Sequence, residues 1–135
     1  MKLAIISFTA AGKDLSIRLS NALAQDSCML FTTNKLADET VPSYGTDLNT
    51  WTGNAFSNYD GIVFISACGI AVRAIAPHLK SKTTDPAVVV ARTVCYFTGF
   101  GSYWSGQRIN LVRSSRNTSH SCYYYCYRRK RLVFH

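Results

Sequence analysis

The stretch that most constrains the fold is residues 59–90, which reads as a strand, a turn, a helix and a further strand. Asp60-Gly61 is a turn signal. Ile62–Ile65 and Ala87–Val90 are short, wholly apolar runs rich in β-branched residues. Runs of this kind are typical of parallel strands that are buried on both faces.

Between these two runs lies a tight crossing made of small residues, namely Ser66, Ala67 and Gly69. The pattern after it predicts a helix over residues 70–79. A strand followed by such a turn points a helix N-terminus at the carboxyl end of a parallel strand. Open α/β sheets place their ligands at that end, and the helix N-terminus there favours anions.

The first part of the chain alternates strand and helix in the same way. Its apolar patterns predict a strand at Lys2–Ser7, a helix at Lys13–Ala24, a strand at Cys28–Phe31, a polar loop at 32–46 and a short helix at Asp47–Ser57. The resulting order β-α-β-α-β-α-β is that of a doubly wound fold. For residues 1–90 we therefore expect an α/β, three-layer architecture with a parallel, doubly wound sheet of about four strands and right-handed crossovers.

Charge and composition change abruptly after residue 90. The formal net charge is +8, yet residues 1–90 hold seven basic and seven acidic side chains and sum to zero. Residues 91–135 hold the other eight basic residues, no Asp or Glu, and three of the five cysteines. No helical stripe or strand alternation continues there. We therefore expect an ordered domain at 1–90 and an irregular, poorly ordered basic tail at 91–135.

The tail raises an alternative function. Tyr123–Tyr125 and Tyr127 lie beside Arg128–Arg131. Aromatic rings next to cations can stack on bases and neutralise phosphates, which is the chemistry of a nucleic-acid-binding module. The competing interpretation is that natural selection never shaped the tail for this purpose.

Other features limit the classes of protein. Cys122 and Cys126, with His120 and His135 nearby, do not have the spacing of the four ligands that a zinc site needs, so we expect no metal. No apolar run is long enough to cross a membrane. The first residues turn polar too soon for a signal peptide. We therefore expect a cytoplasmic protein with reduced thiols.

Basic residues in and after the third predicted helix suggest an anionic ligand. Gly69 and Arg73 lie where backbone N–H groups and a guanidinium could hold a carboxylate or phosphate. In the plainer interpretation, Gly69 only forms a turn and Arg73 is a surface residue. His78, Lys80 and Lys82 follow at the helix end, where the macrodipole alone favours cations. Both interpretations stay open for each group.

Several stretches together resemble a known family. They are Asp60–Ile65, Gly69–Lys80 (GIAVRAIAPHLK), Lys82–Val90 (KTTDPAVVV), Lys2–Thr9 and Gly12-Lys13. On these motifs the chain resembles the N-terminal domain of the CbiG family, the cobalt-precorrin-5A hydrolases of anaerobic cobalamin (vitamin B12) biosynthesis. The resemblance covers about the first two thirds of the chain and is loose between residues 25 and 58.

The resemblance implies an enzymatic reaction. Family members hydrolyse the δ-lactone of cobalt-precorrin-5A to cobalt-precorrin-5B and release acetaldehyde. Water attacks the lactone carbonyl, so such a site must stabilise an oxyanion and hold peripheral carboxylates. No cofactor is implied, because the cobalt is carried by the substrate. The implied partners are the cobalt-corrinoid tetrapyrrole and other cobalamin-pathway enzymes, with no nucleic acid and no membrane.

The resemblance also gives candidates for substrate contact, while no catalytic residue can be assigned. They are Ser66, Gly69, Arg73, Lys80, Lys82, Thr84 and Asp85.

After Val90 the family pattern continues with an acidic pair, a stretch like VISLLSGHIGGANEL and later TPVITTATDVNG, and this chain has neither stretch in frame. When residues 95–111 and 120–132 are read one nucleotide on, permitted codons spell most of both stretches in the right order. We hypothesise that the tail from about Ala91 is a frameshifted reading of the family's own gene. The chain would then be a truncated and inactive form, and the composition of the tail would be explained.

Three classes of function therefore remain. The first is a truncated lactone hydrolase. The second is a nucleic-acid-binding module, for which salt-dependent RNA binding that vanishes without residues 91–135 would be evidence. The third is a non-catalytic tetrapyrrole-binding or partner domain, which would bind a cobalt-corrinoid without releasing acetaldehyde.

Overall fold

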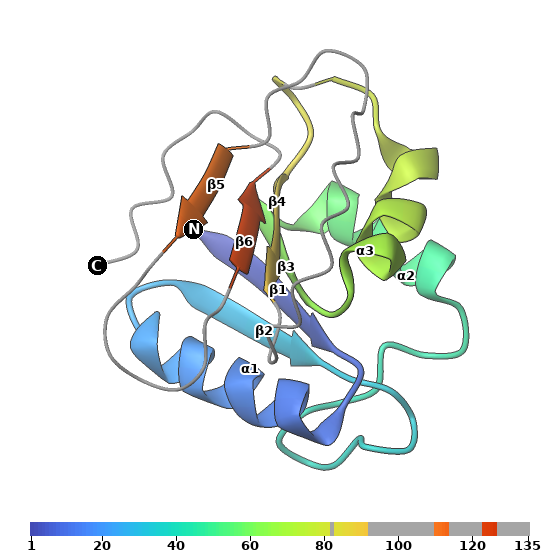
Figure 1. The fold of residues 1–135 in the computed structure, drawn as a ribbon. Coiled ribbons are helices and arrows are strands. Elements are labelled where there is room, and N and C mark those ends of the chain that lie inside the picture. Colours follow the sequence, from blue (N-terminus) through green and yellow to red (C-terminus); the bar gives the residue numbers. More distant parts are fainter. Residues whose placement is uncertain (82, 92–109, 114–122, 127–135) are drawn as a thin grey trace.

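The computed structural model describes residues 1–81, 83–91, 110–113 and 123–126 (Figure 1). Its centre is a six-stranded sheet in the order β2-β1-β3-β4-β6-β5. The elements of the first part are β1 (Lys2–Ser7), α1 (Ala10–Ala22), β2 (Ser27–Phe31), α2 (Leu48–Asn58), β3 (Gly61–Ile65), α3 (Cys68–Ile75), a 3₁₀ turn η1 (Ala76–His78) and β4 (Ala87–Ala91). The predicted α/β fold with a four-stranded parallel sheet is confirmed for this part.

The first four strands pair in parallel. Ile5 of β1 lies between Leu30 of β2 and Val63 of β3, and Val63 in turn pairs with Val89 of β4. The chain moves outward from β1 to β2 and then returns to the other side of β1 to form β3. The sheet is therefore doubly wound, and its topological switch point lies between β1 and β3.

Strands β1, β3 and β4 are buried on both faces because they consist mainly of consecutive apolar residues, while the edge strand β2 is partly exposed. One face packs against α2 and α3 and is formed by Ala4, Ile6, Ile62, Phe64, Val88 and Val90. The other face contacts Leu15 and Leu19 of α1 and is formed by Ile5, Val63, Ile65, Val89 and Ala91. Figure 1 shows α1 on one side of the sheet and α2 with α3 on the other, which gives the three expected layers.

The helices begin at residues that cap them. The Thr9 hydroxyl accepts a hydrogen bond from the Gly12 N–H at 3.0 Å, so α1 begins at Ala10 rather than at Lys13. The Asp47 carboxylate accepts from the Asn49 and Thr50 N–H groups at 3.1 Å each and so caps α2. Helix α1 ends at Ala22 rather than at Ala24.

The third helix also differs from its predicted bounds. It starts at Cys68 rather than near residue 70 and gives way at Ala76 to η1, which contains Pro77. Proline has no N–H for a helical hydrogen bond and its ring crowds the preceding turn. The α-helix therefore ends before the predicted terminus near Leu79, and the chain continues as the 3₁₀ turn η1 to His78.

Two further strands extend the sheet beyond β4. Strands β5 (Asn110–Arg113) and β6 (Tyr123–Cys126) are antiparallel to each other, and β6 is antiparallel to β4. The expectation of an irregular tail is wrong for these residues. A free strand edge such as that of β4 presents unpaired N–H and C=O groups, and tyrosine-rich segments suit strand geometry. The rest of the predicted tail lies outside the described residues.

Candidate functional site

The carboxyl edge of β1 and β3 is the candidate site, because two helices begin there on opposite faces of the sheet. β1 ends at Ser7 and leads through Thr9 into α1. β3 ends at Ile65 and leads through Ser66 into α3. This is the switch point of the sheet, where doubly wound folds bind ligands.

The N-terminus of α3 is the more open of the two helix starts. Its N-cap residue is Ala67, which offers no side-chain hydrogen bond. Gly69 is exposed, and a Cβ added to it would meet nothing within 4 Å. The Ile70 N–H donates to the Ala67 carbonyl at 3.1 Å, so this group is not available to a ligand. The exposed Gly69 at the start of α3 therefore offers room and its own N–H to a small anionic group.

Two predicted residues flank this position. Ser66 lies in the turn, where its N–H donates to the Ala91 carbonyl at 3.1 Å and its hydroxyl donates to the Ala67 carbonyl at 3.0 Å. Arg73 is exposed in the last turn of α3, four residues after Gly69 and hence on the same side of the helix. The structure therefore brings Ser66, Gly69 and Arg73 to one region of the surface.

The other predicted residues lie at the opposite edge of the sheet. Helix α3 runs back from the carboxyl edge, so Lys80, Thr84 and Asp85 come just before β4, whose first residue Ala87 pairs with the first residue of β3. A five-residue strand spans about 16 Å, which separates the two edges. Lys82 lies outside the described residues.

Asp85 has a structural role at this amino edge. It is 5% exposed, and its carboxylate accepts from the backbone N–H groups of Lys80 and Ser81 at 2.8 and 3.0 Å. Its own N–H donates to the Ser81 carbonyl at 2.9 Å. Asp85 therefore closes the turn that leads into β4. Its contact with a substrate remains a prediction.

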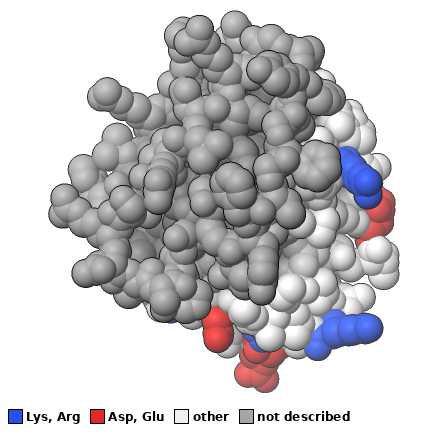
Figure 2. Space-filling model, in the orientation of Figure 1, with Lys and Arg blue, Asp and Glu red and all other residues white. Residues whose placement is uncertain are grey.

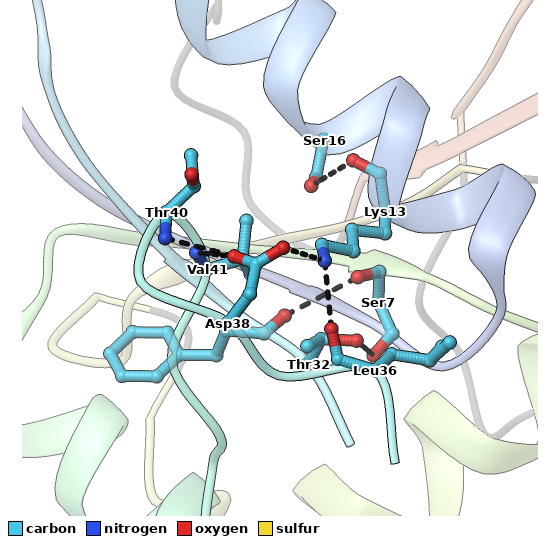
Figure 3. A network of polar contacts seen from close by, with 9 residues as sticks. Ser7, Lys13, Ser16, Thr32, Leu36, Asp38, Thr40 and Val41 are labelled. Carbon is cyan, nitrogen blue, oxygen red and sulfur yellow. Dashed lines mark hydrogen bonds and ion pairs between the residues drawn. The ribbon is translucent and has the colours of Figure 1, made fainter. Parts of the chain in front are cut away.

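Sequence reasoning missed a polar cluster at the carboxyl edge (Figure 3). The Lys13 amine, in the first part of α1, donates to the Leu36 carbonyl at 2.7 Å and forms an ion pair with Asp38. Asp38 also accepts from the N–H groups of Thr40 and Val41 at 2.8 and 2.9 Å. The bond from Lys13, followed by those two N–H groups, lowers the pKa of the Asp38 carboxyl below its ordinary value.

Comparison with known proteins gives a family match for the middle of the chain. Residues 50–98 match the family model described as "Cobalamin synthesis G N-terminal". This range includes β3, the turn at Ser66, and α3 with Gly69 and Arg73.

Residues 50–98 are similar to the CbiG N-terminal domain.

Two curated relatives match the same part of the chain. The cobalt-precorrin-5A hydrolase of Salmonella typhimurium is 42% identical over 89 residues, which cover 65% of this chain and 24% of that protein. The cobalt-precorrin-5A hydrolase of Priestia megaterium is 30% identical over 90 residues, which cover 64% of this chain and 24% of that protein. The chain therefore spans about a quarter of the length of these relatives.

One solved structure is also similar to this chain. It is that of a cobalamin biosynthesis protein G homologue from Sulfolobus solfataricus, with 25% sequence identity and a TM-score of 0.47. The similarity covers 67% of this chain and 25% of that one.

The thiols and acids of the described residues do not gather into a metal centre. Among the described residues, no group of three His, Cys, Asp or Glu side chains could hold a metal ion. Cys28 and Cys68 are not joined in a disulfide. Burial, and secondarily the negative charge of Asp26, raises the pKa of the Cys28 thiol. The residues weighed for zinc, Cys122 and Cys126 with their neighbouring histidines, have no described side chains.

The described surface of the chain carries mixed charge. Figure 2 shows separate basic and acidic side chains on the described part of one face. The basic run at 128–131, on which the nucleic-acid alternative depends, lies outside the described residues. Within the described part of the chain, no helix combines the length and apolarity needed to cross a membrane.

Proposed function

We propose that this CbiG-like domain contributes to cobalamin biosynthesis by binding the tetrapyrrole substrate of a cobalt-precorrin-5A hydrolase at the carboxyl edge of β1 and β3. The observation that carries the proposal is the start of α3. There, a helix N-terminus without a side-chain cap, the exposed Gly69 and the exposed Arg73 lie together at the switch point. The matching relatives are cobalt-precorrin-5A hydrolases, which supports this choice of ligand.

The proposed chemistry of these residues is binding and orientation. A peripheral carboxylate of the macrocycle would accept hydrogen bonds from the Gly69 N–H at the start of α3 and from the Arg73 guanidinium. Charged partners make such bonds stronger than neutral ones. Holding the macrocycle by its carboxylates would fix the position of the lactone for attack by water.

We further propose that this chain binds without catalysing the reaction. The Ser-Gly-His stretch that the family resemblance leads us to expect after Val90 is not in frame. The frameshift hypothesis for residues 91–135 is tested by sequencing the gene across the codons for Val88–Cys95. A single-base slip that restores the two missing stretches would support the hypothesis. A reading frame without such a slip would refute it.

The binding proposal is tested by titrating the full chain with cobalt-precorrin-5A under anaerobic conditions and following the corrinoid absorbance. Arg73→Gln should weaken binding about tenfold or more, because it removes a charge-assisted hydrogen bond. Arg18→Gln is the matched control, because Arg18 is an exposed arginine of α1. Equal effects of the two variants would refute a specific site at α3.

A third variant tests which edge of the sheet binds the ligand. Lys80→Gln removes an exposed charge at the amino edge and should leave binding unchanged. A loss equal to that in Arg73→Gln would overturn the placement at the carboxyl edge. Acetaldehyde is measured in the same samples. Binding without acetaldehyde supports the proposal, and its release would show that the chain is active.

The predictions of cellular location and of further partners also remain proposals. We propose a cytoplasmic location and the other enzymes of the cobalamin pathway as further partners.

A further inference from the structure

The segment between β2 and α2 is held at the carboxyl edge mainly by one side chain from another element. This segment, residues 33–41, is here called the strap. It begins after Thr32, whose N–H donates to the Pro42 carbonyl at 3.0 Å, so that the base of the strap is closed. In the described part of the chain, the side chains outside the strap that donate hydrogen bonds to it are Lys13, at its middle, and Ser43, next to its base.

The internal bonds of the strap make it one unit. The Asp38 carboxylate accepts from the Thr40 and Val41 N–H groups, and the Asp38 N–H donates to the Val41 carbonyl at 3.1 Å. The Leu36 N–H donates to the Thr33 carbonyl at 3.0 Å. The groups that Lys13 contacts therefore belong to a turn that is already ordered, and they would move together.

The attachment of this unit to the rest of the domain is limited. Most of the strap is exposed, and Val41, at its end, is its one fully buried side chain. The Lys13 side chain is 17% exposed and that of Asp38 is 50% exposed, so water and salt reach this ion pair. Segments with few buried apolar contacts open at lower free-energy cost than the core.

We propose that the strap opens and closes as one unit over the carboxyl edge of the sheet, separately from the unfolding of the core, and that Lys13 sets the fraction of time for which it is closed. The closed strap occupies the Lys13 ammonium group, and opening exposes that positive charge beside the end of β1. This inference goes beyond the proposed substrate site at α3 and does not depend on which ligand binds there.

Amide hydrogen exchange in the full 135-residue chain tests this inference. The amides of Thr40 and Val41 report on the strap, and those of Ile5 and Val63 report on the core. In the unmodified chain the strap amides should exchange faster than the core amides. Asp38→Asn keeps an oxygen for the two N–H groups but removes the charge that Lys13 contacts. It should accelerate strap exchange about three- to tenfold and leave the core rates within about twofold.

Two matched controls lie on the strap itself. Glu39→Gln removes a neighbouring negative charge, and Lys35→Met removes a positive one, while both side chains are exposed. Neither variant should change strap exchange. Lys13→Met removes the bond to the Leu36 carbonyl as well as the ion pair, so it should accelerate strap exchange at least as much as Asp38→Asn. The double variant should exchange no faster than Lys13→Met, because the ion pair is already lost in that single variant.

Salt provides a readout that a general loss of stability would not give. Raising sodium chloride to about 1 M should accelerate strap exchange in the unmodified chain and not in Asp38→Asn, since screening acts on the ion pair. If Lys13→Met does not fold, the effect of losing the ion pair is measured from Asp38→Asn and the salt series alone. Strap amides that exchange together with the core, or equal effects of Asp38→Asn and Glu39→Gln, would overturn the inference.

Discussion

Gly53 of α2 leaves the space that the ring of His78 occupies. A Cβ added to Gly53 would lie 2.9 Å from Cε1 of that ring. The Nε2 atom of His78 lies 3.0 Å from the Asn49 backbone oxygen and 2.9 Å from the Asn49 side-chain oxygen, and the ring packs against Phe56. A glycine in the middle of a helix thus allows α2 to meet η1, the segment that follows α3.

Gly53→Ala should therefore destabilise the domain although alanine favours helices. Alanine would stabilise α2 by about 0.5–1 kcal/mol, but His78 would have to move and lose its hydrogen bond and ring contact. We expect a net loss of about 0.5–1.5 kcal/mol in the free energy of unfolding, measured with urea. In a His78→Ala background the obstacle is gone, and the same substitution should become stabilising. An unchanged sign in that background would contradict the steric explanation.

Phe64→Ala should remove a large part of the stability of the domain. The Phe64 ring is 0% exposed and lies edge-on to Trp51, with 6.3 Å between the ring centroids. Large-to-small changes at such positions cost about 3–5 kcal/mol, and a whole domain has about 5–15 kcal/mol. Val72→Ala is the control, because Val72 is 41% exposed and should change stability by less than about 0.5 kcal/mol. Similar urea midpoints for the two variants would show that Phe64 is not central to the core.

The sheet could be predicted because each central strand is a continuous apolar run. Ile62–Ile65 and Ala87–Val90 have no polar residue for solvent to reach, and both are buried on both faces. Helix ends were less certain because they depend on single residues. Thr9 caps α1, which begins three residues before the predicted start at Lys13, and the Thr9 hydroxyl was a signal that could have been used.

The candidate site could be predicted only in part because neighbours in sequence need not be neighbours in space. Gly69 and Lys80 belong to one stretch of the sequence that resembles the family, but the helix between them carries the chain from one edge of the sheet to the other. The topology alone would have placed Lys80 at the amino edge. The contact between Lys13 and Asp38 joins residues 25 positions apart across a loop, and no periodic pattern indicates such a pair.

Two substitutions of Asp85 should have very different effects on the stability of the domain. Asp85→Ala leaves the part-buried N–H groups of Lys80 and Ser81 without their acceptor, and the loss costs about 1–3 kcal/mol for each group that water cannot reach. Asp85→Asn keeps an oxygen in the same place and should retain most of the stability. Thermal unfolding of both variants measures the difference. Equal melting temperatures would contradict the role of Asp85 as the acceptor that closes this turn.

Protonation of Asp47, which removes the cap of α2, should require a pH below the ordinary pKa of an aspartate carboxyl. The hydroxyl of Thr50 and the N–H groups of Asn49 and Thr50 lower the pKa of the Asp47 carboxyl below its ordinary value of 3.8. A lowered folded-state pKa means that the carboxylate stabilises the helix above the ordinary pKa, and that this stabilisation is lost as the pH falls through the lowered one. The amide resonances of Asn49 and Thr50 should therefore titrate with a midpoint below 3.8. Asp47→Asn should abolish that titration, and a midpoint above 3.8 would show that the carboxylate is not held by these donors.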